Sequence, residues 1–125
     1  MTDQEVFDYV STFLLKQGVP SKDLTQKNQP CLYRGPNGTK CAVGCLIPDE
    51  LYDPVMESMP VVSFGKFPDV YAMLGLGKHS RYSLLAALQL SHDWYFSSTD
   101  ELKKRLRIVA IDKNLSTVVL DNLHD

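Results

Sequence analysis

Apolar residues recur at helical spacing near the start of the chain: Val6, Val10, Phe13 and Leu14. This spacing places them on one face of a helix. Thr2 and Glu5 stand three residues apart, as in a capping box, and Gly18 is a residue type that often ends helices. We therefore predict a helix over residues 3–17.

Two later stretches show the same amphipathic pattern. Their apolar positions are Leu84, Leu85 and Leu88 in the first, and Leu102, Leu106, Val109 and Ala110 in the second. Ser98 and Glu101 form another capping-box pair before the second stretch. We predict helices over residues 81–95 and 99–113, with short helical turns near residues 48–57 and 67–74.

The central part of the chain predicts a β-hairpin, because residues 31–34 and 39–42 flank the turn sequence Gly-Pro-Asn-Gly. A two-residue turn pairs Leu32 with Cys41, whereas a three-residue loop places Cys31 opposite Cys41. Residues 117–120 are β-branched and apolar, which favours an edge strand or an extended tail.

These elements together predict an α+β fold for residues 1–125. We expect a compact, mostly helical single domain with a central β-hairpin packed by the three helices. The nearest alternative is an all-helical bundle with an inserted hairpin.

Composition narrows the functional classes. The chain is 44% hydrophobic and 22% charged with a formal net charge of -2, so it lacks the basic excess of a nucleic-acid-binding domain. No apolar run approaches the length needed to span a bilayer. The acidic start does not resemble a secretory signal, and three cysteines are an odd number, so we expect a cytoplasmic protein with reduced thiols.

One segment carries a resemblance. It runs Cys-Leu-Tyr-Arg-Gly-Pro-Asn-Gly-Thr-Lys-Cys-Ala-Val-Gly-Cys-Leu-Ile-Pro-Asp-Glu-Leu-Tyr over residues 31–52, with Met56 and Glu57 after it. It resembles a group of small uncharacterised proteins of bacteriophages, prophages and bacteria, and the resemblance extends to Gln89 and the pair His92-Asp93. It implies a non-enzymatic phage or prophage accessory protein in the bacterial host cell. Its partner would be a host protein, with a defence system as one candidate.

The cysteines offer an alternative chemistry. Cys31, Cys41, Cys45 and His92 have the donor types of a zinc site, but they lack the close C-x2-C pair of common zinc folds. A thiol enzyme needs a base near its nucleophile, and the candidate nucleophiles are Cys41 and Cys45. Asp93 follows His92 directly, so on a helix the two point about 100° apart and Asp93 is not expected to orient the imidazole. We favour buried packing thiols and a hydrogen-bonding histidine at a helix end, with no catalytic residue, metal or cofactor.

Candidate partner-binding residues are aromatic or charged. Trp94, Tyr95 and Phe96 form an unbroken run at a predicted helix end, so at least one ring should be exposed and available to a partner. Arg34 and Glu57 are secondary candidates. Arg34 is more readily explained by an internal ion pair with Asp49, Glu50 or Glu57.

Overall fold

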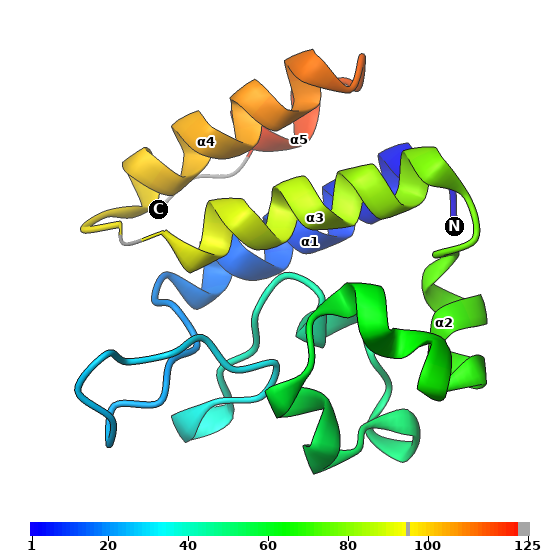
Figure 1. Cartoon of the computed structure of the whole chain (residues 1–125). Helices are drawn as coiled ribbons and strands as arrows, with labels where there is room; N and C mark the ends of the chain where they lie inside the picture. Colours follow the sequence, from blue (N-terminus) through cyan, green and yellow to red (C-terminus); the bar gives the residue numbers. More distant parts are fainter. Residues whose placement is uncertain (95, 123–125) are drawn as a thin grey trace.

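Three helices form the centre of the computed structural model, which describes residues 1–94 and 96–122: α1 (Asp3–Gln17), α3 (His79–Asp93) and α4 (Thr99–Asp112). α1 and α3 lie side by side and run in the same direction, and α4 runs back across them (Figure 1). Each of the three contacts the other two. Their apolar faces therefore meet in one core, as the hydrophobic periodicity predicts.

The predicted capping residues set the ends of these helices. The Thr2 hydroxyl accepts a hydrogen bond from the Glu5 N–H while the Glu5 carboxylate accepts one from the Thr2 N–H. Gly18 ends α1 in the left-handed conformation, with φ 73°. The Ser98 hydroxyl accepts from the Glu101 N–H at 3.3 Å. The capping box of α1 is confirmed. At α4 the Ser98 cap is confirmed, but the reciprocal half of the predicted box is not formed, because the Glu101 carboxylate accepts from the Ser97 N–H.

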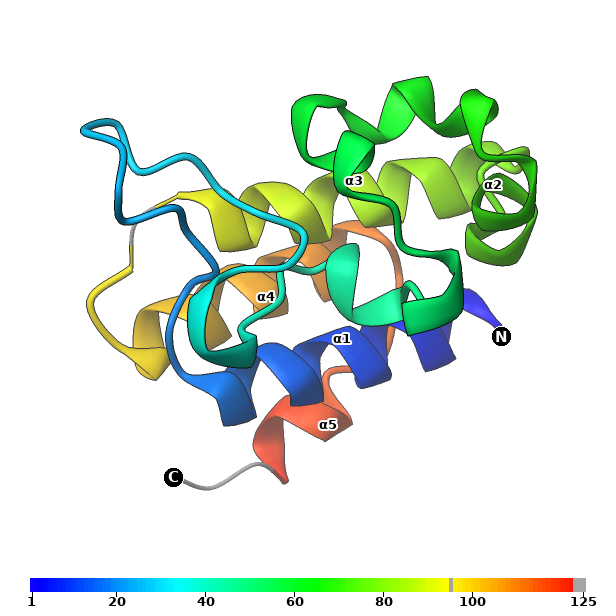
Figure 2. The same cartoon turned by 90° about the horizontal axis from the view of Figure 1, so that it is seen from below.

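An irregular segment, residues 19–67, covers the side of α1 and α3 that faces away from α4 (Figure 2). Its backbone bends through short 3₁₀ turns at Pro36–Gly38, Gly44–Leu46, Asp49–Leu51, Pro54–Ser58 and Val61–Lys66. It contributes apolar side chains to the core, each at most 2% exposed: Ala42, Val43, Ile47, Met56 and Phe64. The segment then leads into the short helix α2 (Pro68–Leu74), which ends at Gly75.

The predicted hairpin is wrong, and with it the α+β fold class. Within the described residues, β pairing is limited to two isolated bridges, Arg34 with Lys40 and Lys22 with Cys31. The first bridge matches neither register that the sequence suggests. The protein is instead mostly helical, and the hairpin inserted in the alternative bundle is also missing.

Side chains explain why no ladder extends from the turn. The Val43 N–H donates to Gln89 Oε1 of α3 at 3.0 Å, and the Lys40 N–H donates to Gln17 Oε1 of α1 at 2.9 Å. The Tyr33 N–H donates to Glu57 Oε1 at 2.8 Å. The N–H groups of Tyr33 and Lys40, which a hairpin would pair across strands, are therefore satisfied by side chains, and the Leu32 N–H donates to the Ser21 carbonyl. These backbone donors are hydrogen-bonded without a sheet.

The C-terminal part also differs from the prediction. Residues 117–120 form neither an edge strand nor an extended tail, because Val118–Asp121 makes the short helix α5. Leu120 is fully buried and α5 contacts α1, so tertiary packing overrides the β-branched composition. Among the described helices, none combines the length and the apolar character required to cross a bilayer.

Candidate functional site

A cleft of about 310 Å³ opens between α3 and the irregular segment. Its surface is mostly apolar. α3 contributes Gln89, Leu90 and Asp93 among others, and the facing segment contributes Cys31, Tyr33 and Cys41. The two parts of the sequence that carry the resemblance thus meet across this cleft.

Cys31, His92 and Asp93 come together at one end of the cleft, with donor atoms within 4.8 Å of one another. His92 Nδ1 lies 3.1 Å from Asp93 Oδ1. The expectation that Asp93 does not orient the imidazole is therefore wrong. Gln89, one helical turn earlier, donates from Nε2 to the same Oδ1 at 2.7 Å and draws the carboxylate back along the helix toward the ring.

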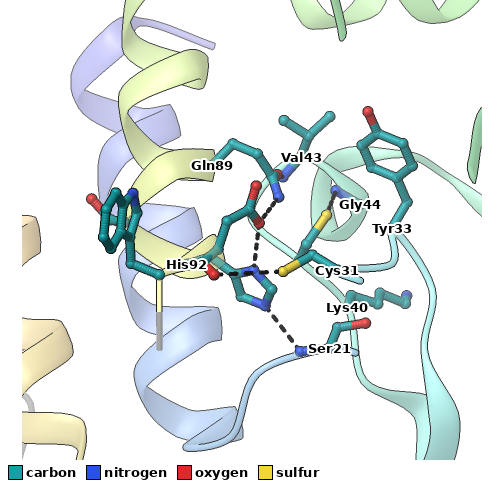
Figure 3. A network of polar contacts seen from close by, with 12 residues as sticks. Ser21, Cys31, Tyr33, Lys40, Val43, Gly44, Gln89 and His92 are labelled. Carbon is teal, nitrogen blue, oxygen red and sulfur yellow. Dashed lines mark hydrogen bonds and ion pairs between the residues drawn. The ribbon is translucent and has the colours of Figure 1, made fainter. Parts of the chain in front are cut away.

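The protonation pattern of His92 follows from its two neighbours (Figure 3). The Ser21 backbone N–H lies 2.9 Å from His92 Nε2 and can only donate, so Nε2 accepts. In the neutral ring the proton is then on Nδ1, which donates to Asp93 Oδ1. The fully buried ring thus ties the loop after α1 to the end of α3. The prediction that His92 is a hydrogen-bonding histidine at a helix end is confirmed.

This pattern disfavours thiol catalysis. A general base must offer a free lone pair to the nucleophile, and the Nε2 lone pair of His92 is engaged by the Ser21 N–H. The Cys31 thiol instead contacts the Asp93 backbone carbonyl at 3.8 Å. Burial, and then the negative charge of Asp93, raise the pKa of Cys31 to about 12. Reactive cysteines have lowered pKa values. The environment of Cys31 raises its pKa, which makes the thiol less reactive.

The other two thiols are packing groups in this structure. Burial is the main cause of the raised pKa of Cys41 and of the raised pKa of Cys45, which reaches about 12. Cys41 Sγ accepts from the Gly44 N–H at 3.3 Å, and the Cys45 thiol donates to the Ala42 carbonyl at 3.1 Å.

A zinc site does not fit this arrangement. Among the described residues, the metal-ligand cluster contains Cys31, His92 and Asp93, whereas Cys41 and Cys45 are not part of it. Zinc binds thiolate and neutral imidazole through free lone pairs. Both nitrogens of His92 already take part in hydrogen bonds, and the Ser21 N–H occupies the Nε2 lone pair that a metal would need.

Arg34 and Glu57 hold the irregular segment together. Glu57 accepts hydrogen bonds from the backbone N–H groups of Tyr33 and Arg34 and from the Tyr52 hydroxyl, at 2.6 to 3.1 Å. The Arg34 guanidinium pairs with Asp49, donates to a backbone carbonyl and stacks over the Tyr52 ring at 4.6 Å. The structure therefore gives Arg34 the internal ion pair that the sequence favours.

The aromatic run divides between surface and core. Trp94 is 66% exposed and Phe96 is buried, whereas Tyr95 lies outside the described residues. The prediction that at least one ring is exposed is confirmed. The guanidinium of Arg105, on α4, donates to the Trp94 carbonyl at 2.8 Å and to the Ser91 carbonyl at 3.3 Å, which closes the C-terminal end of α3.

Trp94 borders a second hollow, which lies between α3 and α4 and has a volume of about 370 Å³. Residues that line this α3–α4 groove include Leu90, Trp94, Arg105, Ile108 and Asp112. The three apolar side chains among them are each more than half exposed. Sequence reasoning found Trp94 but missed Ile108, although an isoleucine on the charged face of a predicted helix is a visible signal.

The sequence matches no protein-family model, and searches of curated proteins and of solved structures find no significant match.

Proposed function

We propose that this protein is a non-enzymatic binding protein that engages another protein through the α3–α4 groove. In the bacterial setting that the resemblance implies, the partner is a host protein, with a defence system as a candidate. The observation that carries the proposal is the exposure of Leu90, Trp94 and Ile108 around one hollow. Scattered exposed apolar residues are ordinary, but grouped ones mark binding surfaces.

The shape and charge of the groove favour an amphipathic helix as its occupant. The groove lies between two helices and offers an apolar floor to a third. Arg105 provides positive charge at the Trp94 end, whereas Asp112, which pairs with Lys113, is an acidic group that lines the groove seven residues further along α4. A helix with an apolar stripe, acidic residues at one end and basic residues at the other complements this pattern.

Site-specific crosslinking tests the proposal. A photoreactive phenylalanine analogue replaces Ile108 in one variant and Val55 in another, because Val55 is similarly exposed but lies on the irregular segment. Each variant is irradiated in bacterial lysate, and crosslinked proteins are identified by mass spectrometry. We expect a protein that crosslinks from position 108 and not from position 55.

Affinity measurements with that purified protein complete the test. Trp94→Ala and Ile108→Ala should each weaken binding by about 2 kcal/mol, about 30-fold, as expected for central apolar anchors. Val55→Ala should bind like the wild type. Equal crosslinking from both positions, or wild-type affinity in both groove variants, contradicts the proposal. Dimerisation through this face, seen by sedimentation and lost in Ile108→Ala, would assign the groove to a second copy instead.

A further inference from the structure

The cleft on the other side of α3 has its own chemistry. Among the residues that line it, Asp93 and Glu57 are acidic and none is basic. The rest of the lining is mainly aromatic, aliphatic and thioether side chains, including Tyr82, Leu90 and Met59. A cavity of about 310 Å³ is at the small end of the range for ligand pockets, so it suits one side chain or a small molecule.

The two carboxylates differ in what they can still bind. Glu57 already accepts from two backbone N–H groups and from the Tyr52 hydroxyl. Asp93 accepts from Gln89 Nε2 and His92 Nδ1, and both bonds go to Oδ1. Neither of these two bonds uses Asp93 Oδ2, and the side chain is 38% exposed, with the Cys31 thiol as a further hydrogen-bonding neighbour of the carboxylate. Asp93 is therefore the carboxylate of the cleft that can accept from an incoming group.

The position of Asp93 is fixed before any ligand arrives. Gln89 Oε1 accepts from the Val43 N–H, so its Nε2 faces Asp93. His92 is fixed in turn by the Ser21 N–H. Each donor to Asp93 is thus locked by a backbone group of the irregular segment, and such preorganisation lowers the cost of binding.

The charge of Asp93 already acts on the cleft wall. It contributes to the raised pKa of Cys31, Tyr33 and Cys41, in each case after the larger effect of burial. The negative potential that keeps these groups protonated also attracts a cation. Lys22 lies near Cys31 and opposes this potential in part.

We infer that the cleft between α3 and the irregular segment binds a cation on an apolar stem, an ammonium or guanidinium group that pairs with Asp93 Oδ2 while its stem packs on Tyr82, Leu90 and Met59. An arginine or lysine side chain of a polypeptide and a free alkylamine share this chemistry. The inference does not depend on the α3–α4 groove.

Titration by nuclear magnetic resonance with small probes tests the inference. The probes are n-butylguanidinium and n-butylamine, with n-butanol and butyrate as neutral and anionic controls of the same stem length. We expect both cations to shift the amide signals of cleft residues, with dissociation constants on the order of millimolar for ligands of this size. n-Butanol should bind at least ten-fold more weakly, and butyrate should not bind.

Variants separate the charge from the cavity. Asp93→Asn keeps the size of the side chain and should weaken butylguanidinium binding at least ten-fold. Asp69→Asn, which removes an exposed carboxylate on α2 outside the cleft, should leave binding unchanged. Ala86→Leu narrows the cleft from its exposed side and should weaken all probes alike. Native amide spectra of each variant establish that it is folded.

Two results would overturn the inference: cleft signals that do not respond to either cation, or equal binding of butylguanidinium to wild type and Asp93→Asn. The source of the cation is decided by a further probe, N-acetyl-arginine N-methylamide. Binding at least ten-fold tighter than that of butylguanidinium identifies a polypeptide side chain as the ligand. Equal or weaker binding identifies a free cation.

Discussion

Gly44 is the glycine whose Cα lies closest to a neighbouring backbone segment, as judged by the space left for a Cβ atom. A Cβ built on it would lie 2.0 Å from the Tyr33 carbonyl oxygen and 2.8 Å from the carbonyl carbon. The atom that would have to move is backbone, and the Tyr33 N–H is itself held by Glu57. We therefore expect Gly44→Ala to destabilise the protein by about 3 kcal/mol, at the upper end for overpacking.

Gly65→Ala is the matched control, because a Cβ there meets nothing within 4 Å and its φ is not in the left-handed region. It should be neutral or stabilise by up to about 1 kcal/mol through the unfolded state. Urea unfolding followed by circular dichroism and by the fluorescence of Trp94, the single tryptophan, gives both free energies. If Gly44→Ala costs less than about 1 kcal/mol, the packing argument for Gly44 and Tyr33 is refuted.

Two further predictions concern the thiols and the turn. The pKa of Cys45 in the folded protein is raised from 9.0 to about 12, so its contribution to stability is complete below pH 9 and is lost as the pH rises toward 12, with a loss of about 1 kcal/mol by pH 10. The free energy of unfolding in urea should therefore fall by about 1 kcal/mol less between pH 8 and pH 10 in Cys45→Ala than in the wild type. An identical fall in the two proteins contradicts the assignment. Gly38 has φ 75° with open space around it, so Gly38→Val should cost about 1–2 kcal/mol through backbone strain alone; Gly65→Val is the comparison, and equal costs for the two would exclude strain at Gly38 as the cause.

Features coded by neighbouring residues could be predicted from the sequence. The capping pairs at Thr2 and Ser98 join groups three residues apart, so they depend on little beyond the local chain. The left-handed Gly38 follows from turn chemistry in the same way. The chain does turn at these residues, but the Arg34–Lys40 bridge belongs to neither of the predicted hairpin registers.

Long-range pairing explains what the sequence reasoning missed. The N–H groups of Lys40 and Val43 bond glutamines that lie 23 and 46 residues away along the chain. No local pattern indicates these partners, so alternating residues around a turn suggested strands. A weak signal existed in Gln89, a polar residue within an apolar helical stretch, because such a residue needs a buried hydrogen-bonding partner.

The error at His92 and Asp93 has a similar origin. The angle of about 100° between adjacent helical residues describes where Cβ atoms point, and it does not fix the positions of side-chain tips. Ser21 holds the far nitrogen of the ring and Gln89 holds the carboxylate, so the two tips converge. Contacts from outside the pair determine the geometry within it.

α3 separates the two proposed binding surfaces, and Leu90 borders both. Its side chain, 58% exposed, lines the cleft on one side of the helix and the α3–α4 groove on the other. A substitution at Leu90 therefore alters both surfaces at once and cannot distinguish between them. Asp93 lines only the cleft and Ile108 only the groove, so variants at these two positions can be assigned. If the Asp93 variant loses only cation binding and the Ile108 variant loses only protein binding, the helix pair α3–α4 carries two independent sites.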